Sequence, residues 1–103
     1  MCGIIGINSN KPVSGTIINS LKKLEYRGYD SAGIATLSSG QINEVKSEGR
    51  VDNLEKNSLV QNMNGTIGIG HVRWATHGLP NSINAHPHSS LNVSVVHNGI
   101  IEN

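Results

Sequence analysis

Short apolar runs along the chain alternate between the spacing of a strand and the spacing of a helix. Residues 3–8 form an apolar run that is typical of a buried strand. The next apolar residues recur three or four positions apart, which predicts an amphipathic helix that begins at Ser14 as its N-cap and stops at Gly28. The predicted apolar face of this helix consists of Ile17, Ile18, Leu21 and Leu24.

A hairpin and a weaker helix are predicted next. Residues 32–37 form an apolar run, residues 41–46 alternate apolar with polar side chains, and the Ser-Ser-Gly sequence between them is typical of a turn. These two segments are therefore expected to pair as a hairpin. Residues 51–60 carry few apolar side chains and predict a weak helix.

The second half of the chain is predicted to hold two strands joined by a long loop. Residues 66–72 alternate larger side chains with Gly68 and Gly70, an arrangement that lets neighbouring side chains approach the backbone closely. Residues 73–88 are polar and contain two prolines, which predicts a long, exposed, irregular loop of the kind that carries function. Residues 91–96 form the last predicted strand.

The composition of the chain excludes several classes of protein. The chain has 103 residues, enough for one domain, and its 8 basic and 7 acidic residues give a net charge of +1. This balance, with 3% aromatic residues, does not supply the basic, ring-lined surface that binds nucleic acid. No apolar run approaches the roughly 20 residues that cross a membrane, and no basic segment precedes the first apolar run as in a signal peptide. We therefore expect a cytoplasmic protein without nucleic-acid or membrane partners.

The histidines do not have the spacing of a metal site. His86 and His88 are separated by one residue, and His71 and His77 are six positions apart, so neither pair matches the helical or finger spacings of zinc ligands. We therefore expect no metal and no cofactor, and we interpret these histidines as hydrogen-bonding residues of loops.

Cys2 is the candidate nucleophile. It is the only cysteine, so no internal disulfide can form. Met1 precedes this small residue, and its removal would leave a free α-amine beside the thiol. An α-amine has a pKa of about 7.7–8.0 and can serve as the base for the thiol of its own residue. The alternative is that Cys2 is a small, inert, buried apolar residue.

Two further positions carry groups suited to binding a substrate. Arg73 follows an apolar strand, and a guanidinium can bind a carboxylate through two parallel hydrogen bonds; the alternative is a surface salt bridge. Asn98-Gly99 also follows an apolar strand. An Asn carboxamide beside a Gly N–H can stabilise an oxyanion, although the same dipeptide is a common hairpin turn.

Five sequence blocks resemble one family. The first six residues, Met-Cys-Gly-Ile-Ile-Gly, resemble the start of class II glutamine amidotransferases, which are N-terminal-nucleophile hydrolases. Residues 24–33, 70–78, 84–88 and 95–103 narrow the resemblance to the glutaminase domain of the glutamine–fructose-6-phosphate aminotransferase (glucosamine-6-phosphate synthase) family. The strings Tyr-Arg-Gly-Tyr-Asp and Arg-Trp-Ala-Thr-His are its most specific parts. The resemblance covers the whole chain but only the first part of that domain.

The resemblance implies both a fold and a reaction. The implied fold is α+β, a truncated part of the αββα sandwich of N-terminal-nucleophile hydrolases. Residues 1–103 would form an incomplete type-2 glutamine amidotransferase domain, without sugar-isomerase domains. The implied reaction hydrolyses glutamine and releases ammonia for the synthesis of glucosamine 6-phosphate from fructose 6-phosphate. Glutamine is then the substrate, and a separate chain would carry the rest of the glutaminase and the sugar-isomerase domains.

The resemblance also implies roles for individual residues. Cys2 would attack the side-chain amide of glutamine, and Asn98 and the Gly99 N–H would hold the oxyanion. Arg73 would bind the substrate carboxylate, and Trp74 would close over the substrate. The other residues with an implied role are Thr76 and His77 in the substrate wall, Arg27 and Tyr29 near the nucleophile, and His86 on the side that faces the synthase domain.

A second hypothesis is that the chain is a non-catalytic fragment or remnant of a split or disrupted synthase gene. It rests on the apolar pair Ile100-Ile101 close to the last residue. As a separate departure from the family, this sequence does not contain the aspartate that binds the α-amino group of glutamine. Loss of that ion pair would weaken glutamine binding by about a thousandfold. This hypothesis therefore predicts little glutaminase activity in the chain alone.

Overall fold

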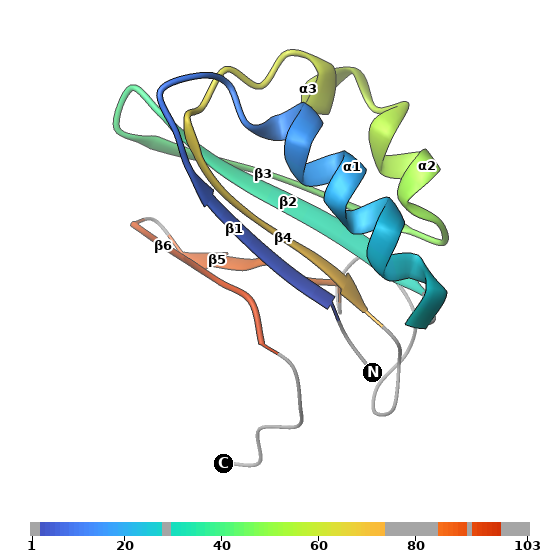
Figure 1. Ribbon diagram of the computed structural model, residues 1–103. Coiled ribbons are helices and arrows are strands. Elements are labelled where there is room, and N and C mark those ends of the chain that lie inside the picture. The colour runs from blue at the N-terminus through green and yellow to red at the C-terminus, as the bar shows by residue number, and fades with distance from the viewer. Residues whose placement is uncertain (1–2, 28–29, 74–84, 91, 98–103) are drawn as a thin grey trace.

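A four-stranded antiparallel sheet forms the centre of the structure, a computed structural model that describes residues 3–27, 30–73, 85–90 and 92–97 (Figure 1). The strand order is β1-β4-β2-β3, so β4 carries hydrogen bonds along both of its edges. The strands are β1 (Gly3–Asn8), β2 (Ser31–Ser38), β3 (Gln41–Glu48) and β4 (Ile67–Arg73). All four strands confirm sequence predictions, with boundaries that differ from the predicted ones by at most two residues.

Three helices cover one face of this sheet (Figure 1). They are α1 (Ser14–Leu24), followed by the single 3-10 turn η1 (Glu25–Arg27), α2 (Val51–Glu55) and α3 (Ser58–Gln61). The predicted apolar face of α1 is confirmed, since three of its side chains are buried in the core and Leu24 packs against them. The core therefore lies between the helices and the sheet.

Two glycines in β4 allow α1 to lie close to the sheet. A Cβ atom on Gly70 would lie 2.5 Å from Ile17 Cγ2, and one on Gly68 would lie 2.7 Å from Ile17 Cδ1. Both distances are shorter than a carbon–carbon contact, so a larger residue here would force the Ile17 side chain or the helix itself to move. The close approach predicted for residues 66–72 is confirmed.

Two predictions about helix ends are wrong. Val13, not Ser14, is the N-cap of α1, because the Ser14 hydroxyl instead donates to a backbone carbonyl in the segment after α3. The predicted helix over residues 51–60 is two short helices, because Asn57 turns the chain and accepts a hydrogen bond from the Leu59 N–H as the N-cap of α3.

A second, two-stranded sheet lies against the opposite face (Figure 1). It consists of β5 (His88–Ser90) and β6 (Val93–Val95). The α+β class is confirmed, with a helix layer, a central sheet and a second strand layer. No helix within the described residues is long and apolar enough to cross a membrane.

The prediction of an exposed loop over residues 73–88 is wrong at both ends of this range, which are the parts that the structure describes. Arg73 belongs to β4 and is only 8% exposed, Ala85 and Pro87 are buried, and His88 begins a strand. Packing on the sheet buries Arg73 and partly buries His86, which a local pattern of polar residues does not indicate. Residues 74–84 lie outside the described residues.

Candidate functional site

The alternation of side chains along β4 separates a structural face from a polar face. Gly68, Gly70 and Val72 face α1, and the residues between them therefore face the second sheet. His71 lies on that second face and pairs with Ile4 of β1 and Gly33 of β2. Arg73, two residues further along, lies on the same face.

The start of β1, the start of β2 and the end of β4 meet at one end of the sheet. Gly3, the first residue of β1, pairs with Val72, and Ser31, the first residue of β2, pairs with Arg73. The Asp30 N–H also donates to the Arg73 carbonyl at 2.7 Å. Three segments that are far apart in sequence therefore converge around Arg73.

Arg73 and Asp30 form a mostly buried ion pair at this end of the sheet. Arg73 Nη1 lies 3.8 Å from Asp30 Oδ1, and their side chains are only 10% and 13% exposed. The Ser31 hydroxyl donates to the same Oδ1 at 2.9 Å. Asp30 Oδ2 is buried and accepts no hydrogen bond from the described part of the chain. Arg73 does form the salt bridge of the alternative interpretation, but that salt bridge is mostly buried and not on the surface. The carboxylate orients a guanidinium that is already largely removed from water.

His71 is a fully buried histidine with one defined hydrogen bond. Its Nε2 lies 2.9 Å from the carbonyl oxygen of His97, which can only accept, so Nε2 carries the proton and donates. Nδ1 is then an acceptor, and it is buried without a donor among the described residues. Burial lowers the pKa of His71 to about 4, with a smaller contribution of the same sign from the Arg73 charge. The ring is therefore neutral at pH 7.

His86 packs on His71 and is held there by the backbone. The two rings are stacked with their centroids 4.2 Å apart, and the ring of His88 lies tilted against that of His86, with their centroids 4.5 Å apart. A Cβ atom on Gly33 would lie 1.8 Å from the His86 carbonyl oxygen, so only glycine lets this backbone rest on β2. Burial, and then the neighbouring His71, lower the pKa of His86 to about 3.

The structure brings together the predicted site residues whose side chains it describes. Arg73 and His86 lie on the same face of the sheet, and both are close to His71. Arg27 lies in η1. The other predicted residues lie outside the described residues, and they are Cys2, Tyr29, Trp74, Thr76, His77, Asn98 and Gly99.

Sequence reasoning missed three residues of this site. His71 was interpreted as a loop residue, but it is a buried residue of a central strand. Asp30 and Gly33 received no role, although both lie in the sequence block 24–33 that carries the resemblance. The only sequence signal for these three residues is that each lies in one of the blocks that resemble the family.

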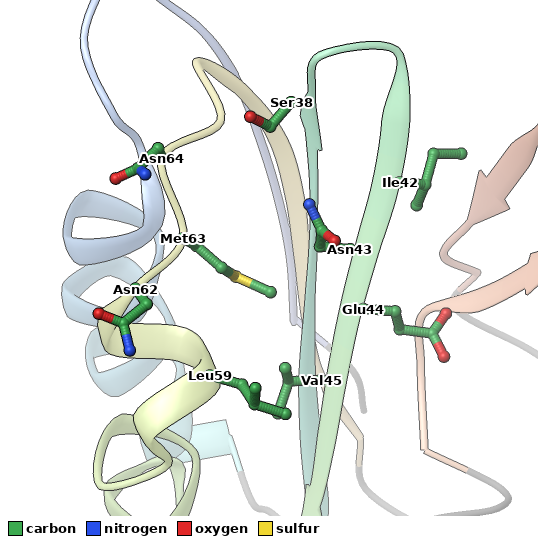
Figure 2. A pocket seen from close by; sticks show the side chains of 9 residues that line it. All are labelled: Ser38, Ile42, Asn43, Glu44, Val45, Leu59, Asn62, Met63 and Asn64. Carbon is green, nitrogen blue, oxygen red and sulfur yellow. The ribbon is translucent and has the colours of Figure 1, made fainter.

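A separate cleft of about 400 Å³ lies at the free edge of β3 (Figure 2). Carboxamide and apolar side chains line it, and its one charged residue, Glu44, already faces Lys46 at 3.7 Å and accepts a hydrogen bond from Ser89. The cleft reaches Ser38, about 20 Å along β2 from Ser31. Its described lining holds no cysteine or histidine, and its one carboxylate is already paired, so it is not the candidate site.

The described part of the chain contains no group of three or more histidine, cysteine or acidic side chains arranged to hold a metal ion. Among the histidines that do cluster, the rings of His71 and His86 are stacked, and the ring of His88 is tilted by 58° to that of His86.

No family sequence model matches the chain. The chain is 56% identical over 103 residues to the glutamine–fructose-6-phosphate aminotransferases [isomerizing] of Mesorhizobium japonicum and Bradyrhizobium diazoefficiens, and 57% identical to that of Brucella suis. The whole chain is similar to the N-terminal region of these proteins. The chain spans only 17% of the length of these relatives. The resemblance inferred from the sequence blocks is confirmed.

Solved structures with the same fold include two amidotransferase-type enzymes of purine biosynthesis. Glutamine phosphoribosylpyrophosphate (PRPP) amidotransferase from B. subtilis, complexed with ADP and GMP, matches with a TM-score of 0.73 and 26% identity over 91% of this chain and 20% of that chain. The allosteric regulatory enzyme of purine biosynthesis matches with a TM-score of 0.75 and 26% identity over 85% of this chain and 19% of that chain. The described fold is thus part of an N-terminal-nucleophile amidotransferase fold, and the chain is glutamine amidotransferase-like. These similarities do not favour the hypothesis of a non-catalytic remnant.

Replacement of Gly33 tests whether the polar face is assembled by backbone contact. Gly33→Ala is expected to displace the segment around His86, because the added Cβ would overlap its carbonyl at 1.8 Å and overpacking costs about 1–3 kcal/mol. Amide hydrogen exchange of residues 93–95 should then accelerate about tenfold or more. The matched control is Gly6→Ala on the same face, where the Cβ would meet only Ile69 Cγ2, at 3.9 Å, among the described residues. Equal exchange rates in the two variants would contradict the contact.

The buried neutral His71 predicts a loss of stability in acid. Its pKa is about 4 when folded and 6.5 when exposed, so the unfolded chain binds more protons between these values. Its contribution is therefore complete above pH 6.5 and declines as the pH falls toward 4. Urea unfolding at pH 7 and pH 4.5 should show that His71→Gln, which cannot titrate, loses about 2 kcal/mol less than the unchanged chain. An equal loss in both proteins would contradict burial of a neutral His71.

Proposed function

We propose that this end of the sheet belongs to a glutaminase site, in which an N-terminal cysteine hydrolyses glutamine and releases ammonia. The observation that carries the proposal is the mostly buried Arg73, oriented by Asp30 at the point where β1 begins. A buried guanidinium favours an anionic ligand group, and the α-carboxylate of an amino acid matches its planar donors. Residues 1–103 would then form part of a type-2 glutamine amidotransferase domain.

The pairing of β1 with β4 supports Cys2 as the nucleophile. Cys2 is bonded to Gly3, and Gly3 pairs with Val72, the residue before Arg73. Adjacent strands lie about 4.8 Å apart, which is close to the distance between the α-carboxylate and the side-chain amide of an extended glutamine. Glutamine bound to Arg73 by its carboxylate would therefore present its amide near the start of β1.

The chemistry follows from these groups once Met1 is removed. The α-amine of Cys2 would take the proton of its own thiol, and the thiolate would attack the amide carbon of glutamine. Asn98 and the Gly99 N–H would stabilise the oxyanion of the tetrahedral intermediate. The protonated amine would then donate to the departing nitrogen, which leaves as ammonia, and water would hydrolyse the remaining thioester to glutamate.

The supporting residues have proposed roles around this reaction. Trp74 and Tyr29 are bonded to Arg73 and Asp30, the two residues of the buried ion pair. Trp74 would close over the bound substrate, and Tyr29 would support the nucleophile. The remaining supporting residues are Thr76 and His77 in the substrate wall, Arg27 near the nucleophile, and His86 toward the synthase part.

The use of the ammonia is proposed from the relatives. Their name couples glutamine to fructose 6-phosphate, and we propose the same transfer here, with glucosamine 6-phosphate as the product. A separate chain would carry the rest of the glutaminase and the sugar-isomerase domains, and the reaction would take place in the cytoplasm.

Mass spectrometry with a glutamine-mimicking diazo-ketone tests the proposal. The intact chain should lack Met1 and gain one adduct, and Cys2→Ala should gain none. Arg73→Lys should raise the half-saturating reagent concentration about tenfold or more, since lysine cannot form the paired hydrogen bonds of a guanidinium. The matched control is Arg50→Lys, an arginine whose side chain is 59% exposed, which should leave that concentration unchanged. An adduct that persists in Cys2→Ala, or no adduct in the unchanged chain, would overturn the proposed function.

A further inference from the structure

Burial of a histidine at position 71 costs folding free energy. His71 lies in the central strand of the sheet, is 0% exposed, and its Nδ1 has no donor among the described residues. An apolar side chain of similar size would fill the same space without burying an unsatisfied nitrogen. The feature that only the histidine supplies is the hydrogen bond from Nε2 to the His97 carbonyl, at 2.9 Å.

The position of the His71 ring is fixed from several sides. Its backbone is paired with β1 and β2 at once, through Ile4 and Gly33. Its ring stacks on His86 at 4.2 Å, and the backbone of His86 rests on Gly33, the residue paired with His71. The Nε2–H bond is therefore directed from a rigid part of the sheet.

The acceptor of this hydrogen bond, the His97 carbonyl, lies outside the strands, in the segment that follows β6. His97 is exposed and follows the end of β6 by two residues. Its carbonyl belongs to the peptide group that also contains the N–H of Asn98. Because that group is planar, a donor that holds the carbonyl also sets the direction in which the chain enters Asn98.

We propose that His71 is a positioning residue, which orients the His97–Asn98 peptide through the Nε2–H···O=C hydrogen bond and thereby aligns the oxyanion donors Asn98 and Gly99. The inference rests on the proposed function, since it gives a geometric requirement to the same oxyanion site. Oxyanion stabilisation depends on donors fixed in advance, and a displacement of about 1 Å can cost about a hundredfold in rate. His71 does not touch the substrate in this mechanism.

Three substitutions at His71 separate positioning from packing. Leu retains an apolar side chain without a donor, Asn places its amide nitrogen near the site of Nδ1, and Gln places it near the site of Nε2. With the diazo-ketone, His71→Leu and His71→Asn should lower the maximal inactivation rate constant of Cys2 about 10- to 100-fold, and His71→Gln should remain within about threefold of the unchanged chain. The half-saturating concentration, which reports carboxylate binding at Arg73, should change less than about threefold in all three.

Two controls make the result specific. Alkylation of Cys2 by iodoacetamide, which needs no oxyanion site, should proceed at one rate in all variants. Ile34→Val, a truncation on the helix-covered face of the same sheet, should leave the inactivation rate constant unchanged. Urea unfolding should show His71→Leu to be at least as stable as the unchanged chain, because the buried unsatisfied nitrogen is removed.

The outcomes distinguish this inference from the function on which it rests. If the unchanged chain forms no adduct at Cys2, the proposed function fails and the positioning role fails with it. If the unchanged chain reacts and the Leu and Asn variants react at the same rate, only the positioning role is overturned. A slow Gln variant, or a rise in the half-saturating concentration that matches the loss of rate, would also overturn it, since either would show general damage to the fold.

Discussion

The position of β4 between β1 and β2 is the constraint on which the rest of the structure depends. Hydrogen bonds on both edges fix its register, and this register brings Arg73 to the place where β1 and β2 begin. The same strand carries the glycines that admit α1 on one face and His71 on the other. A shift of one residue would exchange the two faces of β4 and remove both the helix contact and the polar site.

The second face of the sheet has a polar end and an apolar end. The polar end buries Arg73, Asp30 and His71, which costs free energy unless these groups have partners or a function. Toward the other end the β5–β6 hairpin covers the face only in part. The large apolar side chains that remain exposed toward this end or on the hairpin are Leu37, Ile67, Val93 and Val95. An apolar band of this kind is the surface that a further sheet layer covers in a sandwich fold.

The sequence pattern predicted the elements that depend on local spacing. The apolar face of α1, the hairpin of β2 and β3, and the glycines of β4 each follow from a periodicity or a turn signal within one segment. The prediction failed where a contact with a distant segment decided the outcome. Ser14 uses its hydroxyl outside its own helix, and β5 exists because its segment pairs with β6 and packs on the sheet.

The candidate site was predictable only in part for the same reason. Arg73 could be proposed because a guanidinium at the end of an apolar strand is suited to binding a carboxylate, but its pairing with Asp30 comes from the register of β4 with β2. The close contact of the His86 backbone with Gly33 joins a strand and a segment that are far apart in the sequence. No local pattern distinguishes His71 from an ordinary polar residue of an alternating strand. Its hydrogen-bond partner, the carbonyl of His97, lies 26 residues away in the sequence, and the local pattern therefore does not reveal it.

The central claim is that glutamine binds at Arg73, and the most direct test is to map where an amino acid binds on the chain. Titration of the ¹⁵N-labelled chain with L-glutamate, the product of the proposed reaction, can be followed by heteronuclear NMR. We predict that binding shifts the backbone amide signals of Gly3, Asp30 and Arg73 and leaves those of Asn43 and Asn62, in the cleft of Figure 2, unchanged. Shifts confined to the cleft, or no shifts at the end of β4, would contradict the assignment of the glutamine site to Arg73.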